Sequence, residues 1–204
     1  MRMGSGKLMA VGFVVFLAGW VPALQLRAEA PTQLVRSTVD RVIEILRDSR
    51  FQGKAKRQER RAHLRTAILA RFDFEEMAKR SLGNHWRRNQ DKKQEFVSVF
   101  AEFVEDSYVG HIESYKNERI VYTRERLDEE VAEVDTKVFS RNGDEIPIQY
   151  KLHPVGSEWK IYDVVINGVS LVNNYRSQFN RILATSTIDE LIQRMQQKRA
   201  ERES

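Results

Sequence analysis

The strongest constraint on the fold is a change of hydrophobic period within residues 162–179. The first part of this segment is almost continuously apolar, whereas in the second part an apolar residue recurs every three or four positions. The change predicts a buried strand, a tight corner at Asn167-Gly168 and an amphipathic helix. The hydroxyl of Ser170 is placed to cap that helix. The helix must fold back over the sheet that contains the strand, so together they enclose either a packed core or an apolar cavity.

The middle of the chain has the period of β-strands. Alternating apolar and polar residues predict strands over residues 119–126, 130–141, 145–155 and 159–166. The pair Asn142-Gly143 predicts a hairpin turn with positive φ at both central residues, and a second turn is expected at Gly156. Sequential strands joined by short turns predict an antiparallel meander with one face buried under helices.

Helical periodicity precedes and follows this meander. Helices are predicted from Thr32 to a break at residues 51–53, over residues 58–71, from Asp73 to Gly83, from Asp91 to about Lys116, from Ser170 to about Ala184, and from Thr187 to about residue 195. Capping motifs begin at Asp73, Asp91 and Thr187. The aromatic inner face of the helix from Asp91 either packs in the core or forms a pocket wall. The order of elements predicts an α+β fold with a twisted antiparallel sheet of about four strands covered by helices.

The N-terminal residues 1–30 have the layout of a secretory signal peptide. Arg2 and Lys7 precede an apolar stretch over residues 8–26, and small residues follow it. The three possible cleavage points follow Ala23, Ala28 and Ala30. An uncleaved membrane anchor is the alternative, although glycines and a proline interrupt the apolar stretch. We therefore expect the protein to act outside the cytoplasm.

Residues 31–204 are expected to form a single, monomeric domain. The chain contains no Cys, so its core alone must hold an exported domain together. Its net charge is +5, and removing residues 1–30 leaves about +3. Basic clusters at residues 57–61 and 87–93 are either solvated helix faces or contacts for anionic lipid headgroups or an acidic partner.

Two segments resemble the motifs of one protein family. Residues 72–86 read FDFEEMAKRSLGNHW, and residues 163–179 read DVVINGVSLVNNYRSQF. Their order and their separation of about ninety residues are similar to those of the toluene-tolerance family, also called MlaC. The resemblance extends over nearly all of the chain after about residue 30.

The resemblance implies a soluble periplasmic phospholipid carrier that is not an enzyme and needs no cofactor. It implies two partners, an inner-membrane ABC lipid transporter complex and an outer-membrane lipoprotein–porin complex, between which the carrier moves lipid and so maintains outer-membrane asymmetry. The implied pocket lies between the sheet and the helices. Mapped by residue type, its expected lining is Phe72, Phe74, Met77, Phe100, Phe103, Tyr108, Ile148, Tyr150, Val164, Val169, Leu171 and Tyr175.

Other functions remain open from the sequence. The ligand could be another apolar molecule, such as a hopanoid or a solvent-like compound. A curved sheet wrapped by helices also builds small cone-shaped isomerases and dehydratases, in which Asp163 would be the candidate base. The histidines show no metal-binding spacing, and no nucleophile elbow or phosphate-binding loop is present. Arg176 faces either a lipid headgroup or a carboxylate.

Overall fold

The computed structural model describes residues 29–128 and 130–203. Residues 1–28 are not described, so the predicted signal peptide lies almost entirely outside the described residues. Within the described part of the chain, no helix is both long and apolar enough to cross a membrane.

An antiparallel sheet with strand order β1-β2-β3-β4-β5 forms the centre of the fold. The strands span Arg119–Leu127 (β1), Ala132–Phe139 (β2), Glu145–Val155 (β3), Glu158–Ile166 (β4) and Val169–Ser170 (β5). The first four lie where the alternation of residues predicted them, which confirms the α+β meander. The fifth was not predicted, because it consists of only the two residues before the next helix.

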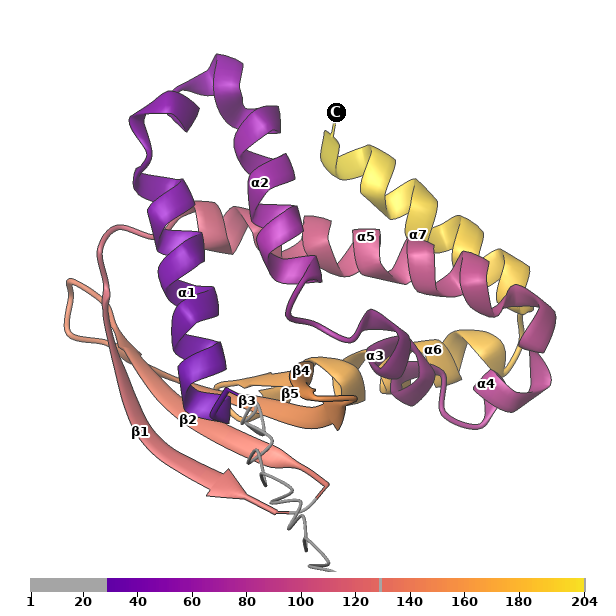
Figure 1. The fold of residues 1–204 in the computed structure, drawn as a ribbon. Coiled ribbons are helices and arrows are strands. Elements are labelled where there is room, and N and C mark those ends of the chain that lie inside the picture. The colour runs from indigo at the N-terminus through magenta and orange to yellow at the C-terminus, as the bar shows by residue number, and fades with distance from the viewer. Residues whose placement is uncertain (1–28, 129, 204) are drawn as a thin grey trace, which may run out of the picture.

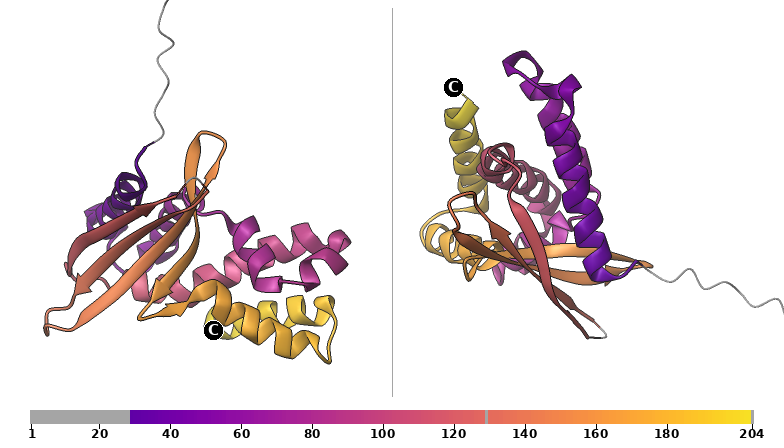
Figure 2. Two further views of the ribbon diagram at one scale, coloured as in Figure 1. Left: turned by 90° about the horizontal axis from the view of Figure 1, so that it is seen from below. Right: turned by 90° about the vertical axis from the view of Figure 1, so that its left-hand side faces the viewer.

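The helices form two groups around this sheet. They span Pro31–Arg47 (α1), Arg57–Leu69 (α2), Phe74–Leu82 (α3), His85–Arg88 (α4), Lys93–Glu113 (α5), Leu171–Leu183 (α6) and Ile188–Glu203 (α7). Figure 1 shows α1 lying over the sheet, whereas α3, α4, α6 and α7 gather to one side of it. Helix α5 starts in that lateral group and runs back over the sheet to β1, and the two further views in Figure 2 show the same division.

The turns explain how the strands are joined. Asn167 and Gly168 both have positive φ, 49° and 78°, so the predicted corner is a two-residue hairpin turn. In the connection between β2 and β3 only Gly143 has positive φ, so the expectation for Asn142 is wrong. That loop is longer than a two-residue turn, because it runs from Ser140 to Asp144 and closes with a Ser140 N–H bond to the Asp144 carbonyl at 2.9 Å.

Most of the predicted helix caps are present. Asp73 Oδ1 accepts the Glu76 N–H at 2.9 Å, and Ser170 Oγ accepts the Asn173 N–H at 3.0 Å. The prediction for Asp91 is wrong: this residue lies in a short 3-10 turn, Gln90–Lys92, and α5 begins after it without a side-chain cap.

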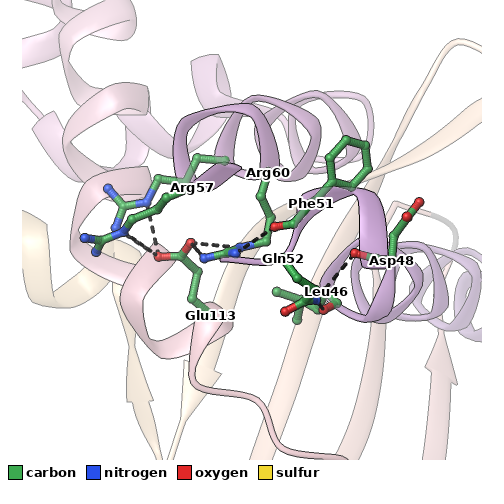
Figure 3. A network of polar contacts seen from close by, with 8 residues as sticks. Leu46, Asp48, Phe51, Gln52, Arg57, Arg60 and Glu113 are labelled. Atoms are coloured by element: carbon green, nitrogen blue, oxygen red, sulfur yellow. Dashed lines mark hydrogen bonds and ion pairs between the residues drawn. The ribbon is translucent and has the colours of Figure 1, made fainter. Parts of the chain in front are cut away.

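The corner between α1 and α2 is fixed to the end of α5 by arginines. Arg60 donates to Glu113 Oε1 at 2.6 Å through Nη2 and to the Phe51 carbonyl at 3.0 Å through Nη1, as Figure 3 shows. Arg61 donates to Glu113 Oε2 at 3.0 Å, and Arg57 lies 3.6 Å from the same oxygen. One carboxylate therefore orients several cationic side chains of α2, and this fixes α1 and α2 above the sheet.

Candidate functional site

The inner face of the sheet is an apolar surface beneath α1. Leu34 and Val35 of α1 pack there against buried side chains of β2, β3 and β4. We call this the sheet cluster; its buried members are Leu34, Val35, Ala132, Val134, Leu152, Ile161, Val164 and Leu171. Six of the predicted lining residues belong to this cluster or pack against it: Phe72, Tyr108, Ile148, Tyr150, Val164 and Leu171.

Other predicted lining residues lie in a separate core among the helices, the helical cluster. Met77, Phe100, Phe103 and Tyr175 are buried there, together with side chains of α7. The Tyr175 ring contacts Phe100 and Phe103 edge-on, at centroid distances of 5.5 and 5.8 Å. These rings are packed against one another between helices.

The remaining predicted residues lie at the borders of the two clusters. Phe72 and Tyr108 pack against both clusters and so form the junction between them. Phe74 packs on the helical cluster and stacks on Phe72 at a centroid distance of 5.9 Å. Val169 lies after the turn between β4 and β5 and is 55% exposed.

A groove of about 690 Å³ opens between α1 and β1. Its volume lies within the range of roughly 300–1,000 Å³ that is typical of small-molecule sites. The side chains lining it are Arg36, Val39, Asp40, Ile43, Glu44, Arg47, Asp48, Tyr115, Glu118, Ile120 and Tyr122. Val39 and Tyr122 also pack against the sheet cluster, so the groove adjoins the apolar surface beneath α1.

None of the predicted lining residues lines this groove. The sequence does contain a pattern that indicates it, because α1 and β1 each carry apolar residues on one face. Val39 and Ile43 are one helical turn apart on α1, and Ile120 and Tyr122 alternate on β1. Each pair places two apolar side chains on one face of its element. The signal is weak because charged residues separate the apolar ones on α1, and because β1 is mostly exposed.

The tyrosine hydroxyls of the groove and of the sheet cluster are neutral donors. Burial raises the pKa of Tyr122 to about 12, and it raises the pKa of Tyr108 to about 12 as well. Burial also raises the pKa of Tyr150 well above its ordinary value. These groups therefore stay protonated at neutral pH and present O–H donors within apolar surroundings.

Asp163, the candidate base, is used to cap a helix. The residue is only 4% exposed, and its carboxylate accepts the Ser170 hydroxyl at 2.6 Å and the Val172 N–H at 3.1 Å. Asp163 does not line the α1–β1 groove. Both oxygens face the N-terminus of α6, where the helix dipole stabilises a negative charge.

Arg176 lies against α3. Its Nε is 3.1 Å from the position that a Cβ on Gly83 would take. Gly83 ends α3, so the guanidinium is at the C-terminal end of that helix, where a cation is favourable. Among the described residues no ion pair joins Arg176 to a carboxylate, and Arg176 does not line the groove.

The structure assigns local contacts to several histidines. His153 Nε2 lies 2.9 Å from Asp73 Oδ2 and joins β3 to the start of α3. The His63 ring packs on Phe51 at 4.4 Å, and the His111 ring lies 6.3 Å from Tyr108. Across residues 29–128 and 130–203, no group of three His, Cys, Asp or Glu side chains is arranged to hold a metal ion.

Comparisons with known proteins agree on one family. The family model described as MlaC protein matches residues 36–197. Toluene tolerance protein ttg2D of Pseudomonas putida is 26% identical over 171 residues, which are 82% of this chain and 79% of that protein. The intermembrane phospholipid transport system binding protein MlaC of Haemophilus influenzae is 24% identical over 174 residues, covering 82% of this chain and 81% of the relative.

A solved structure has the same fold. It is the phospholipid-binding protein from Ralstonia solanacearum, determined in complex with a phospholipid. The two structures align with a TM-score of 0.75 and 23% sequence identity, over 84% of this chain and 97% of the other.

Proposed function

Because this chain belongs to the MlaC protein family, we propose that it is a phospholipid carrier of the periplasm. The observation that carries the proposal is the groove of about 690 Å³ that adjoins the apolar sheet cluster. Support also comes from relatives whose names give phospholipid transport and phospholipid binding. The predicted signal peptide supports export from the cytoplasm.

In this proposal α1 separates from the sheet when lipid binds, and the acyl chains lie along the inner face against which Leu34 and Val35 pack. Their lining would include Phe72, Tyr108, Ile148, Tyr150, Val164 and Leu171 and the groove residues Val39 and Tyr122. If the helices separate around the ligand, the lining extends into the helical cluster through the aromatic side chains buried there. The remaining residues of the proposed lining are Phe74, Met77, Phe100, Phe103, Val169 and Tyr175. Burying acyl chains stabilises the complex by about 0.8 kcal/mol for each CH2.

Tight holding of the chains makes release dependent on partners. A partner can draw the equilibrium toward release only if it binds the lipid-free form better or offers the chains another apolar surface. We propose that an inner-membrane ABC lipid transporter complex and an outer-membrane lipoprotein–porin complex fill these roles, and that the protein thereby maintains the lipid asymmetry of the outer membrane. The carrier itself would act as a monomer, with no catalytic group and no cofactor.

Native mass spectrometry of the mature protein, purified from a bacterial periplasm, tests the proposal. We expect a stoichiometric adduct with the mass of a phospholipid, identified after lipid extraction. An adduct with the mass of a hopanoid would show that the ligand is a hopanoid and not a phospholipid. A folded protein that carries nothing and takes up no phospholipid from vesicles would refute the carrier function.

A further inference from the structure

One polar group near the groove is left without a partner, the hydroxyl of Tyr122. Its oxygen is buried, and no hydrogen-bond partner is present among the described residues. Buried hydroxyls in native proteins are nearly always paired with protein groups, water or ligand, so an unpaired one requires an explanation. Tyr122 lines the groove and also packs against the sheet cluster. The hydroxyl is therefore placed to serve a molecule that enters beneath α1.

The polar side chain opposite Tyr122 on β2 is already engaged. Tyr122 pairs with Thr136 in the register of β1 and β2, and Thr136 donates to the Ile148 carbonyl at 3.0 Å. Burial raises the pKa of Tyr122 to about 12, with a further rise from the Asp40 carboxylate. Because the hydroxyl is a neutral donor at neutral pH, its natural complement is an uncharged or anionic oxygen acceptor.

A cation lies directly over the same ring. The guanidinium carbon of Arg36 is 4.1 Å from the centroid of Tyr122, and Arg36 is an exposed residue that also lines the groove. Within the part of the chain that the structure describes, Arg36 makes no ion pair with a carboxylate. Its planar fork of N–H donors is therefore available to bind a phosphate oxygen.

These two donors occur in the order in which a glycerophospholipid presents its acceptors. Such a lipid has apolar chains, then ester carbonyls, then a phosphate diester. The site has apolar side chains, then a buried hydroxyl, then an exposed guanidinium. We propose that Tyr122 and Arg36 form the polar anchor of the bound lipid, with the hydroxyl donating to an acyl ester carbonyl and the guanidinium contacting the phosphate. This inference rests on the proposed function and names the ligand groups that its site recognises.

The hydroxyl contact is tested with two probe lipids that differ only in their linkage. Wild type and Tyr122→Phe are titrated with a diester phosphatidylcholine and with its diether analogue, which lacks the carbonyl oxygens. We expect wild type to bind the diester about three to ten times more tightly, as one hydrogen bond provides. Tyr122→Phe should lower affinity for the diester to that for the diether and leave diether binding unchanged.

A matched control lies outside the groove. Tyr162 also has an arginine over its ring, Arg80 at 4.2 Å, but it packs in the helical cluster and does not line the groove. Tyr162→Phe should keep the wild-type preference for the diester.

Urea unfolding of lipid-free Tyr122→Phe is a second, independent test. The urea concentration at the midpoint should not fall, because the lost hydroxyl has no hydrogen-bond partner among the described residues. A clear fall would show that the hydroxyl is used within the protein and would overturn the proposal.

The phosphate contact is tested separately with Arg36→Gln. We expect this variant to bind both phosphatidylcholines several times more weakly, while a diacylglycerol of the same chains binds as it does to wild type. An equal loss for diacylglycerol would overturn the role of Arg36.

If wild type binds diester and diether equally, the role of Tyr122 is refuted while the carrier function stands. If wild type binds neither lipid, the carrier function fails, and the anchor fails with it.

Discussion

The buried carboxylate of Asp163 accepts a hydrogen bond from the hydroxyl of Ser170 at 2.6 Å, and the pair joins β4 to the start of α6. The other carboxylate oxygen accepts the Val172 N–H at 3.1 Å. Two hydrogen bonds and the helix dipole together account for a charged group that is only 4% exposed on an apolar strand. The enzyme alternative depended on this residue beside an open pocket, and the geometry instead gives it a capping role.

Replacing Asp163 by Asn should therefore destabilise the fold. The variant retains the shape of the side chain but loses the charge that faces α6, and we expect the free energy of unfolding to fall by about 1–2 kcal/mol. Urea unfolding at pH 7 measures the change. Asp91→Asn is the control, because Asp91 is exposed in the turn before α5, and its effect should stay within about 0.5 kcal/mol. Equal stability of Asp163→Asn and wild type would refute the capping role.

The elements of this fold were predictable because their signals are local. Alternation located β1 to β4, and Asn167-Gly168 marked a corner at which both residues have positive φ. β5 was missed because two residues cannot display a period. Asp91 was misassigned because a capping pattern does not exclude a 3-10 turn before the helix. Local patterns therefore predicted the order of the longer elements, but they missed the one-turn helix α4 and ended the last helix near residue 195, whereas α7 continues to Glu203.

The lining of the candidate site was less predictable, because it depends on which faces meet. Phe100, Phe103 and Tyr108 share one face of α5, and the sequence assigns them to one surface. Helix α5 has 21 residues and is about 30 Å long, so its face meets different neighbours along its length. Phe100 and Phe103 meet α6, and only Tyr108, further along, reaches the sheet cluster. No local pattern encodes where along a helix the neighbour changes.

Glu113 should make stability depend on acid pH. Burial raises the pKa of this carboxyl, but the hydrogen bonds from Arg61 and Arg60 outweigh burial and leave the pKa below its ordinary value. A carboxyl whose pKa is lower in the folded state stabilises the fold above its unfolded pKa of about 4.3. That contribution is lost as the pH falls through the folded pKa. Glu113→Gln should lose about 1–3 kcal/mol at pH 7 and much less near pH 3.

Urea unfolding at pH 7 and pH 3 separates this effect from a general loss of charge. Glu44→Gln is the control, since Glu44 pairs with Arg41 at 2.7 Å but the two side chains are 67% and 56% exposed. Such an exposed pair contributes about 0–1 kcal/mol, so the control should change little at either pH. A Glu113→Gln variant that is destabilised equally at both pH values would contradict the role of the ionised carboxylate.

Gly83 and Gly110 should respond to alanine in opposite directions. Gly83 has φ 55° and ψ −122°, and an added Cβ would lie 3.1 Å from Arg176 Nε. We expect Gly83→Ala to cost about 1–3 kcal/mol, because the backbone is strained for any L side chain and the arginine must move. Gly110 lies within α5 with no atom within 4 Å of an added Cβ, so Gly110→Ala should stabilise by about 0.5–1 kcal/mol. Thermal unfolding compares both variants with wild type, and a stable Gly83→Ala would contradict the tight packing of Arg176.

Filling the groove should reduce lipid loading without unfolding the protein. Val39 lines the groove and packs against the sheet cluster, so Val39→Trp would occupy space that the proposed acyl chain needs. Excluding two methylene groups costs about 1.6 kcal/mol, which corresponds to an affinity roughly fifteen times lower. Gln33→Trp adds the same ring at an exposed position of α1 outside the groove and should bind lipid as wild type does. Lipid that copurifies with each variant, measured by extraction and mass spectrometry, gives the comparison. A folded Val39→Trp protein that remains fully loaded would place the acyl chains elsewhere, and the helical cluster would then become the site to test.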